Sequence, residues 1–571
     1  MRKYLFHSKS DVRIKSGQRF RDQLRLMSKP EMGFVKVIVI NTLAVTLLSL
    51  AVPLAVQVII NNIGVRTMAQ PLVILCLVLF FILSCSGALQ AIQTYTVEVL
   101  QRRLFVRYGL VISERLNFYK EKHFKSANSP ALINRYFDIM IMQGEMVNFF
   151  VSGSGFIIQF VIGFALLAFY HPYFLGIAGF MAQFLILNWI LFGPDGVKAG
   201  SPEADGKYNV VSWVEELSRV RNLFTSDRGR DFSNKKLNHL LNRWLEVRNN
   251  LFNFQFRQHI GLQIFSIVMN IILLGLGGFL VLKGELSAGQ LVAAALVVNG
   301  IISSLPSLQA FFFSIYNYST ALDMIARFYD YPLEEPKLGA KVPERYDFEF
   351  KDLTFMPNYN FNFSFEEGKR NLILVKSFSA IDLFYDALMG ASDHVKGEIR
   401  YHGQLIDDLD LGTIRNHIQI IARDQFFAGT IMENIVGFSE REDFAQTELQ
   451  DVLKRVGLYE NIMELPDKLE TLIQPNSYPL TSSQLIALQV ARAIIMKPKI
   501  LLVTPDFEQI SSYKRKLIFT ELLKPEHGWT LLFFTQRYYV GSFDNFFSFS
   551  RIEMRKLSDQ QEFLKEIENN V

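Results

Sequence analysis

The pattern of apolar and polar positions divides the chain into two parts near residue 305. Before that point the apolar runs are long enough to cross a membrane, because the hydrocarbon core of a bilayer takes ~20 apolar residues of helix. Beyond it the apolar runs are short and alternate with charged helical stretches, as in an α/β domain. The pattern therefore predicts an α-helical transmembrane domain followed by an α/β domain.

The first part contains about six apolar segments of spanning length, separated in two places by long charged stretches. Pro53 predicts a kink in the first span, because proline lacks a backbone N–H and frees a carbonyl of the helix. The second span meets no helix breaker until residues 126–130, so we expect its helix to continue well beyond the membrane. The predicted spans cover residues 34–61, 71–99, 147–169, 174–192, 261–282 and 288–305.

The distribution of charge predicts the orientation of these spans. The predicted outer loops are short and nearly free of Lys and Arg, whereas the inner stretches are strongly basic, so both termini are expected in the cytoplasm. Residues 1–30 are basic and lack the apolar core of a removable signal peptide. A helix over about residues 17–28 would lie on the membrane surface, and a disordered basic tail is the alternative for residues 1–16.

Composition excludes several classes of function. The net charge is only +4, and the basic residues gather near the membrane segments, so the expected partner is membrane lipid and not nucleic acid. Cys76 and Cys85 stand nine residues apart in one apolar helix, a spacing that predicts neither a disulfide nor a metal site. The acidic, amphipathic residues 556–571 predict a solvated C-terminal helix.

The second part carries an ordered series of sequence landmarks. They are Gly397-Glu398-Ile399, Phe427-Ala428-Gly429-Thr430-Ile431, the helical Ala491-Arg492-Ala493-Ile494, and an apolar strand over residues 499–503. In this order they resemble the nucleotide-binding domain of ABC transporters. The six spans with two long internal excursions resemble the transmembrane domain of ABC exporters, and residues 277–291 look like the type I secretion and peptide-exporter branch.

This resemblance covers nearly the whole chain and implies its domain organisation. Residues 1–30 correspond to a basic N-terminal segment or elbow helix, and residues 31–330 to a transmembrane domain of the type IV exporter fold. Its two cytoplasmic coupling regions fall near residues 124–136 and 209–217. Residues 331–342 are a polar, proline-rich linker, and residues 343–571 correspond to an α/β, P-loop-type ABC ATPase domain.

The P-loop position departs from the family. A P-loop uses glycines so that backbone N–H groups can surround the phosphates, a lysine for their charge, and Ser or Thr for Mg²⁺. The segment Lys376-Ser377-Phe378-Ser379-Ala380-Ile381-Asp382 contains no glycine. Asp382 stands at the lysine position, or Ile381 if the alignment slips by one residue. A carboxylate there would repel a triphosphate by ~4 kcal/mol per unit charge at 4 Å, and Lys376 lies at the wrong end of the loop.

The other catalytic positions depart in the same direction. The signature is Leu480-Thr481-Ser482-Ser483-Gln484, with serines where the family has glycines, and Thr504-Pro505 replaces the Asp-Glu pair of Walker B. The Q-loop glutamine falls on Ala422 or Arg423, the switch histidine on Gln536, and the adenine-stacking aromatic near Pro357. The resemblance therefore implies no catalytic residue, metal or cofactor in this chain, with ATP and Mg²⁺ only through a competent partner.

We expect an integral membrane protein, of the bacterial inner membrane, whose intrinsic ATPase is lost. The first hypothesis is the non-catalytic half of an exporter for a peptide, protein or lipid-like substrate, in a heterodimer with an intact ABC half-transporter. The alternative is a non-hydrolysing scaffold or regulator, as a homodimer, that docks partner proteins. A conformational gate that binds another ligand in the altered pocket is a third hypothesis.

Overall fold

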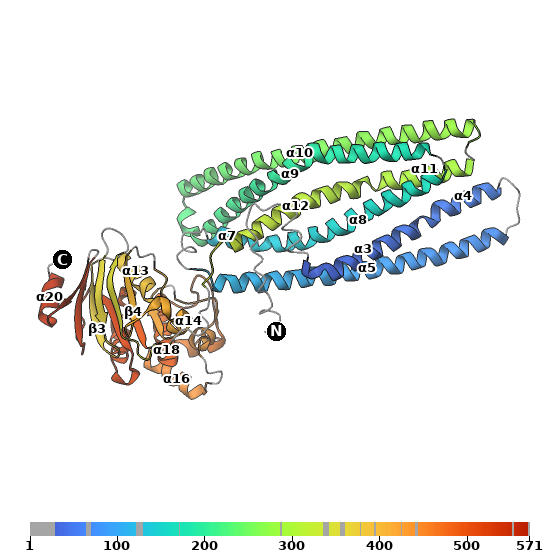
Figure 1. Cartoon of the computed structure of the whole chain (residues 1–571). Coiled ribbons are helices and arrows are strands. Elements are labelled where there is room, and N and C mark those ends of the chain that lie inside the picture. Colours follow the sequence, from blue (N-terminus) through green and yellow to red (C-terminus); the bar gives the residue numbers. More distant parts are fainter. Residues whose placement is uncertain are drawn as a thin grey trace. The chain divides into compact units, whose positions relative to one another are not determined.

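The computed structural model describes residues 29–63, 70–120, 129–170, 172–285, 288–334, 342–354, 360–376, 378–392, 396–423, 425–439, 444–550 and 553–568 (Figure 1). It divides into two compact units, Met1–Leu333 and Glu334–Val571. The basic segment 1–28, with the helix expected over 17–28, and the adenine position near Pro357 lie outside the described residues.

The first unit is built from long helices. Among the described residues, six helices are long and apolar enough to cross a membrane, as the hydrophobic pattern predicts. The elements, in chain order, are η1 (Lys29–Glu31), α3 (Met32–Ser49), α4 (Ala51–Ile63), α5 (Gln70–Asn117), α7 (Ser129–Asn134), η2 (Arg135–Phe137), α8 (Asp138–Tyr170), α9 (Tyr173–Arg219), η3 (Arg221–Phe224), α10 (Asp227–Leu282), α11 (Ala288–Ser303) and α12 (Leu305–Asp330).

The first span is interrupted near its proline, as expected. Helix α3 ends at Ser49 and α4 begins at Ala51. Ser49 is the residue four before Pro53, and this is the carbonyl that a proline ring clashes with and leaves without an N–H donor. The break therefore follows from the sequence position of Pro53.

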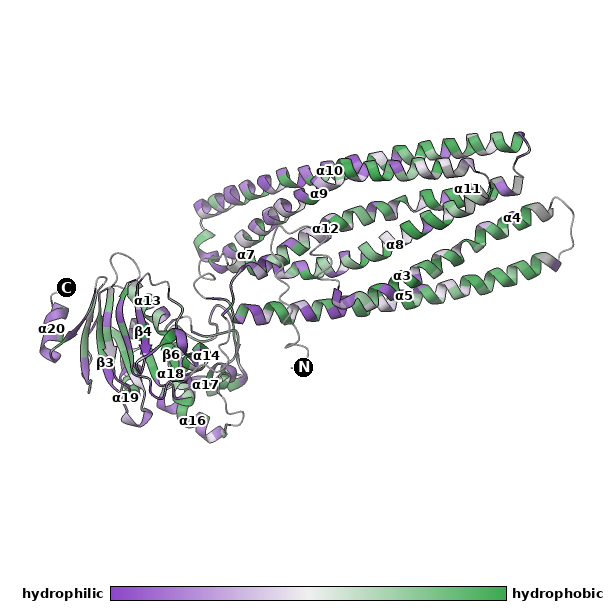
Figure 2. Ribbon diagram, in the orientation of Figure 1, coloured by the Kyte–Doolittle hydropathy of each residue, from purple (hydrophilic) through white to green (hydrophobic). Residues whose placement is uncertain are grey.

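The helices run far beyond the predicted spans. Helix α5 continues to Asn117, and α10 has 56 residues, or about 84 Å at 1.5 Å per residue. Figure 2 shows hydrophobic residues along the part of α9 and α10 nearer the α10–α11 connection, and hydrophilic residues along the opposite part. Hydropathy marks only the apolar part of each helix, which is why the predicted ends fall short of the helical ends.

The two expected coupling regions differ in form. Residues 124–128 of the first lie outside the described residues, and the rest of it forms the short helix α7 and η2. The second, residues 209–217, is a continuous part of α9, which contains Pro194 and Pro202 without being broken.

Small residues let the membrane helices approach closely. A Cβ atom on Gly153 of α8 would lie 2.5 Å from the Phe311 ring of α12, and one on Gly163 would lie 2.9 Å from Ile301 of α11. Interfaces between membrane helices favour such glycines because packing, not the hydrophobic effect, holds the helices together. Helices α8, α11 and α12 therefore pack as neighbours.

The second unit contains two main β-sheets. The antiparallel sheet has the order β2-β1-β4-β5, and the larger, mostly parallel sheet has the order β12-β11-β3-β10-β9-β6. A third sheet pairs β7 with β8. The strands are β1 (Phe348–Thr354), β2 (Asn360–Phe365), β3 (Arg370–Val375), β4 (Lys396–Tyr401), β5 (Gln404–Leu405), β6 (Ile418–Ile421), β7 (Gly429–Thr430), β8 (Leu472–Ile473), β9 (Ile500–Val503), β10 (Thr530–Thr535), β11 (Asn545–Phe549) and β12 (Met554–Leu557).

Helices lie between these strands in sequence and complete the predicted α/β domain. The α-helices are α13 (Ser379–Leu388), α14 (Leu411–Asn416), α15 (Ile431–Val436), α16 (Gln446–Arg455), α17 (Tyr459–Met463), α18 (Ser482–Met496), α19 (Ser512–Leu522) and α20 (Gln560–Glu568), and the 3₁₀ turns are η4 (Ile406–Asp408), η5 (Lys468–Glu470), η6 (Pro505–Gln509) and η7 (Pro525–His527).

The C-terminal segment differs from the expected solvated helix. Residues Met554–Leu557 form strand β12, and only Gln560–Glu568 form helix α20. Phe563 of this helix is fully buried and packs against the Phe546 ring, with ring centroids 5.7 Å apart. An amphipathic and mostly exposed helix is present as predicted, but it begins only at Gln560, and Phe563 attaches its apolar face to the sheet.

Candidate functional site

The connection between β3 and α13 occupies the P-loop position. Strand β3 is central in the large sheet and pairs in parallel with β10 and β11. Only residues 376–378 separate the end of β3 from the start of α13 at Ser379, and Ser377 lies outside the described residues. A P-loop keeps its backbone N–H groups open toward phosphate. Here the residues at the corresponding positions before Asp382 are already helical.

Apolar side chains fix this early start of the helix. Ala380 and Ile381 are buried, with 0% and 3% exposure, and belong to the same hydrophobic cluster as Phe384. The Phe384 ring stacks on Phe363 of β2, with centroids 5.7 Å apart. The Ile381 amide donates to the Phe378 carbonyl at 3.0 Å. The sequence signal was therefore the replacement of small residues by Ile381 and Phe384 as well as the missing glycines.

Asp382 lies on an exposed position in the first turn of α13. An acidic side chain in a first helical turn interacts favourably with the helix dipole. The carboxylate therefore supplies negative charge close to the helix end where the family binds phosphate. Its negative charge opposes the approach of another anion.

Lys376 is engaged on another side of the domain. Its amide donates to the Phe549 carbonyl at 2.8 Å, and its Nζ lies 2.6 Å from the Glu566 Oε2 atom of α20. Glu566 also contacts Arg555 at 2.5 Å. The hydrogen bond from Lys376, supported by the charge of Arg555, lowers the pKa of the Glu566 carboxyl. This lysine therefore binds the C-terminal helix.

The Walker B position at the end of β9 holds a hydroxyl. Thr504 is 7% exposed, and its Oγ1 donates to the Ile421 carbonyl at 3.0 Å and lies 3.2 Å from the Asp506 Oδ2 atom. The same Oδ2 atom accepts from the Arg423 amide at 3.1 Å, and Asp506 Oδ1 accepts from the Gln509 side chain at 2.9 Å. Pro505 opens the turn η6. Asp506 thus links the Walker B position to the Q-loop position.

Glu508 makes a second link, which the sequence interpretation missed. Its Oε1 atom accepts from the Gln536 amide at 3.2 Å and from the Thr535 hydroxyl at 3.0 Å, and its Oε2 lies 3.2 Å from Arg537 Nε. The switch position is therefore bound through its backbone, while the Gln536 side chain is exposed. The alternation of acidic residues at 506 and 508 after the apolar strand was the available signal.

Gln489 and Arg492 of α18 form hydrogen bonds with the backbone of the Q-loop segment. The Gln489 side chain is fully buried and forms two hydrogen bonds with the backbone of Ala422, at 2.9 and 2.7 Å. Arg492 donates to the Gln425 carbonyl at 3.1 Å and the Asn434 carbonyl at 2.6 Å. Burial lowers the pKa of the Arg492 guanidinium to about 10, so it stays charged at neutral pH.

The signature position is locally well formed. Thr481 is the N-cap of α18 and forms a capping box with Gln484, in which the Thr481 amide donates to Gln484 Oε1 at 2.8 Å. The Ser483 hydroxyl donates to the Gln509 carbonyl at 3.0 Å, which ties this segment to η6. Ser482 is half-buried beside it. The helix start survives, but side chains occupy the two glycine positions.

One group of possible metal ligands occurs among the described residues, away from the loops above in sequence. Ligand atoms of Glu521, Glu526 and His527 lie within 4.8 Å of one another. Arg455 contacts the Glu521 carboxylate, and Lys524 Nζ lies 2.7 Å from it. Burial acts to raise the pKa of Glu521, but the hydrogen bonds from Arg455, Lys524 and His527 outweigh it and lower the pKa. The Glu521 carboxylate is therefore already paired with two cations, Arg455 and Lys524.

The structure thus brings together the Walker B, Q-loop, switch and signature positions through η6. Lys376 at the end of β3 faces α20 instead. No protein-family model matches the chain.

The curated relatives are transporters. The chain is 23% identical over 274 residues to a probable multidrug resistance ABC transporter ATP-binding/permease protein of Bacillus subtilis, over 46% of each chain. It is 25% identical over 283 residues to a multidrug resistance ABC transporter ATP-binding and permease protein of Lactococcus lactis, again over 46% of each. A sophorolipid transporter of Starmerella bombicola is 29% identical over 141 residues, which are 24% of this chain and 10% of that protein. The matched part is less than half the length of these relatives.

A solved structure matches nearly the whole chain. It is described as a bacterial Atm1-family ABC exporter with ATP bound, and the superposition has a TM-score of 0.78 at 14% identity. It covers 95% of this chain and 98% of the other. At this identity the match concerns the fold, namely six membrane-length helices followed by a sheet-containing domain.

Proposed function

We propose that this chain, an ABC exporter half-transporter by its fold and its curated relatives, is the non-hydrolysing half of a transport complex. The observation that carries the proposal is the β3–α13 connection, where Ala380 and Ile381 are helical and buried. A phosphate-binding loop needs open backbone N–H groups at this place. The connection offers apolar side chains and the carboxylate of Asp382.

The Mg²⁺ side of the site supports the same proposal. Mg²⁺ needs oxygen ligands in near-octahedral geometry, and the Walker B position offers the hydroxyl of Thr504, which is bonded to Ile421 and Asp506. The carboxylates of Asp506 and Glu508 accept hydrogen bonds from the backbone at the Q-loop and switch positions. Binding a nucleotide would require these bonds to break.

A mechanical role is consistent with the retained interior. The buried face of α18, the capping box at Thr481 and the Arg492 contacts connect the signature helix to the Q-loop segment. Each local feature agrees with the fold, as in a sequence that specifies one stable structure. The domain therefore keeps a defined shape without its nucleotide, and can follow the motion of a partner subunit.

The proposed partner is a second ABC half-transporter with intact motifs. In this family each ATP lies between the P-loop of one subunit and the signature of the other. This chain would present Thr481, Ser482 and Ser483 to the partner's ATP, and the helix N-terminus still favours an anion there. The two serines limit close backbone approach. The signature half that this chain contributes to the partner's ATP site is therefore weakened.

The complex would lie in the bacterial inner membrane with both termini cytoplasmic, and the proposed cargo is a peptide, protein or lipid-like molecule. The second candidate function is a non-hydrolysing scaffold, as a homodimer, that docks partner proteins. It is favoured by the same bulk at Ser482 and Ser483, because a weakened signature is of little use to a catalytic partner.

Purification of the full chain from its host in mild detergent tests these functions. Co-purifying subunits are identified by mass spectrometry, and ATP turnover is measured with and without them. A stoichiometric partner with intact motifs and turnover is the expected result. A homodimer without turnover would contradict the exporter half and leave the scaffold.

Turnover by the chain alone would contradict the loss of the ATP site itself. Photolabelling with 8-azido-ATP separates the remaining cases, because it reports binding without hydrolysis. We expect label on the partner and none on this chain. The partner's subunit serves as the internal positive control in the same sample.

A further inference from the structure

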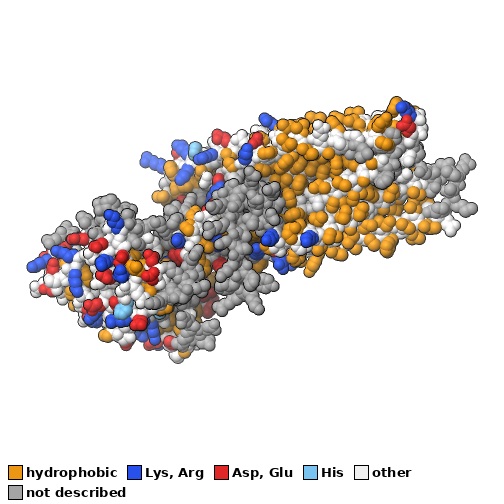
Figure 3. Space-filling model, in the orientation of Figure 1, with side chains coloured by type: hydrophobic (Ala, Val, Ile, Leu, Met, Phe, Trp, Pro, Cys, Tyr) orange, Lys and Arg blue, Asp and Glu red, His pale blue; other side chains and the backbone are white. Residues whose placement is uncertain are grey.

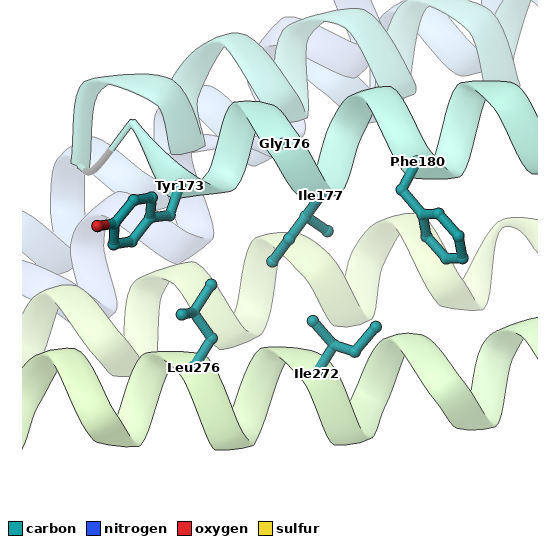
Figure 4. A pocket seen from close by; sticks show the side chains of 6 residues that line it. All are labelled: Tyr173, Gly176, Ile177, Phe180, Ile272 and Leu276. Carbon is teal, nitrogen blue, oxygen red and sulfur yellow. The ribbon is translucent and has the colours of Figure 1, made fainter.

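A groove lies between α9 and α10 near the end where α9 begins and α10 ends. Its volume is about 390 Å³, and it is lined by Tyr173, Gly176, Ile177, Phe180, Ile272 and Leu276. Figure 4 shows Ile177 from α9 and Ile272 and Leu276 from α10 pointing into the space between the two helices. The tyrosine hydroxyl is the single polar side-chain group of this lining.

The groove exists because one position carries no side chain. A Cβ atom on Gly176 would meet no heavy atom within 4 Å. Tyr173 and Phe180, on the same helix, are 58% and 47% exposed. The groove is therefore open on one side, toward the surroundings of the helical unit. Figure 3 shows hydrophobic side chains over this part of the helical unit.

The depth of the groove corresponds to one leaflet of a bilayer. Helix α10 ends at Leu282, followed by Lys283. Ile272 lies eleven residues before Lys283, which is about 16 Å along a helix. Half of a hydrocarbon core of about 30 Å is about 15 Å. The lining on α10, Ile272 and Leu276, thus lies within one leaflet, with Ile272 near the middle of the bilayer.

Lys283, at the end of α10, places a positive charge on the helix face that lines the groove. Leu276 and Lys283 are seven residues apart, a spacing that places them on one stripe of α10. The Lys283 ammonium lies 4.7 Å from the centroid of the Phe279 ring, which continues this stripe. A lysine at the end of a membrane helix reaches the headgroup region.

We propose that the α9–α10 groove binds one acyl chain of a phospholipid, whose headgroup phosphate lies beside Lys283. The apolar lining, the one-leaflet depth and the cation at the membrane surface match the two chemical parts of such a molecule. A helix of a second copy would match the apolar lining, but it would leave the depth and the position of Lys283 without a reason.

Photo-crosslinking tests the proposal on the full-length protein in lipid vesicles. The probe is a phosphatidylglycerol with a diazirine in its acyl chain, and the labelled peptides are mapped by mass spectrometry. We expect strong labelling of residues 172–180 and 272–276. Gly176→Leu, which places a side chain in the groove starting from a Cβ with no heavy atom within 4 Å, should lower this labelling to the background of α5.

Gly87→Leu is the matched control, because Gly87 on α5 is exposed and its Cβ would also meet nothing within 4 Å. It should leave the labelling of the groove unchanged. Lys283→Gln should lower labelling by phosphatidylglycerol, and size-exclusion chromatography checks that each variant is folded. Groove labelling no stronger than that of α5 in the unaltered protein would overturn the proposal, as would protein–protein crosslinks from a photoreactive residue at position 176.

Discussion

The segments at the P-loop position and at the signature position differ in what surrounds them. On the P-loop side, Ala380, Ile381 and Phe384 are buried and the helix begins early. On the signature side, α18 still begins with a capped N-terminus at Thr481. The first segment belongs to the hydrophobic core, whereas the second is a capped helix start followed by Ser482 and Ser483.

This difference shows which interaction each segment depends on. A P-loop is shaped around a ligand, so without the ligand its backbone groups need other partners. Here the hydrogen bonds of the early helix supply them, as from the Ile381 amide to the Phe378 carbonyl. The signature helix is shaped by the domain interior, since residues 485–494 are buried. Its geometry therefore depends on contacts within the domain.

The largest effect is expected for Phe384→Ala on the P-loop side. The ring contacts those of Phe350, Phe363 and Phe534, with centroids 5.3 to 5.7 Å apart. Removing a fully buried aromatic ring costs about 3–5 kcal/mol of unfolding free energy. Differential scanning fluorimetry and hydrogen exchange should show destabilisation of the second unit.

Phe378→Ala is the control, because that ring is 54% exposed and lies in the same connection. Its effect should stay within about 0.5 kcal/mol. Equal effects of the two variants would mean that α13 is not held by the phenylalanine cluster.

A smaller, local effect is expected for Asp506→Ala. The change leaves the Arg423 amide and the Gln509 side chain without their acceptor. Water can reach both donors, so the loss of these bonds costs about 0.5–1.5 kcal/mol. Hydrogen exchange should accelerate in peptides covering residues 420–425 and 505–510, while α18 stays protected.

Asp506→Asn keeps one acceptor oxygen, so its exchange rates should lie between those of the unaltered protein and those of Asp506→Ala. Unchanged exchange at residues 420–425 in the alanine variant would contradict the link between the Walker B and Q-loop positions. Glu508→Ala offers the matched comparison, because it should accelerate exchange around Gln536 and leave Arg423 as it is.

Much of this architecture follows from sequence pattern, and particular residues show where such inference ends. Strand β9 and helix α18 were predicted within a few residues because both lie in nearly continuous apolar runs, which are buried in the structure. The ends of α5, α9 and α10 were not, since hydropathy is silent where a helix leaves the membrane. The absence of glycine from residues 376–382 could be read directly from the sequence.

The pairing of the remaining charged groups could not be read. Glu508 with the Gln536 amide and Lys376 with Glu566 join positions 28 and 190 residues apart. Such contacts depend on loop geometry and on the sheet order, neither of which a local pattern contains. The buried Phe563 that fixes α20 was missed for the same reason.

On the signature side, Thr481→Ala should cost about 1 kcal/mol. Its hydroxyl accepts from the Gln484 amide in the capping box, and loss of an N-cap side chain typically costs 0.5–2 kcal/mol, or roughly 1. Chemical unfolding of the second unit, followed by its intrinsic fluorescence, measures this. Ser482→Ala should change little, since Ser482 is not the cap. A reversed order would mean that the start of the helix is held by another contact.

The smallest effect is expected for Lys376→Met, which removes the ion pair with Glu566. Partly exposed pairs contribute about 0–1 kcal/mol, so the global stability should barely change. The pKa of Glu566 is lowered in the folded protein, first by the hydrogen bond from Lys376. A lowered folded-state pKa gives stability that is present above the unfolded value of about 4.5 and is lost as the pH falls through the folded value. The protection factors of the α20 amides, which are corrected for the intrinsic pH dependence of exchange, should therefore fall on acidification below about pH 4.5. This acid dependence should be weaker in Lys376→Met, because Arg555 alone then supports the carboxylate. An identical pH profile in both proteins would show that the pair of Lys376 with Glu566 does not stabilise α20.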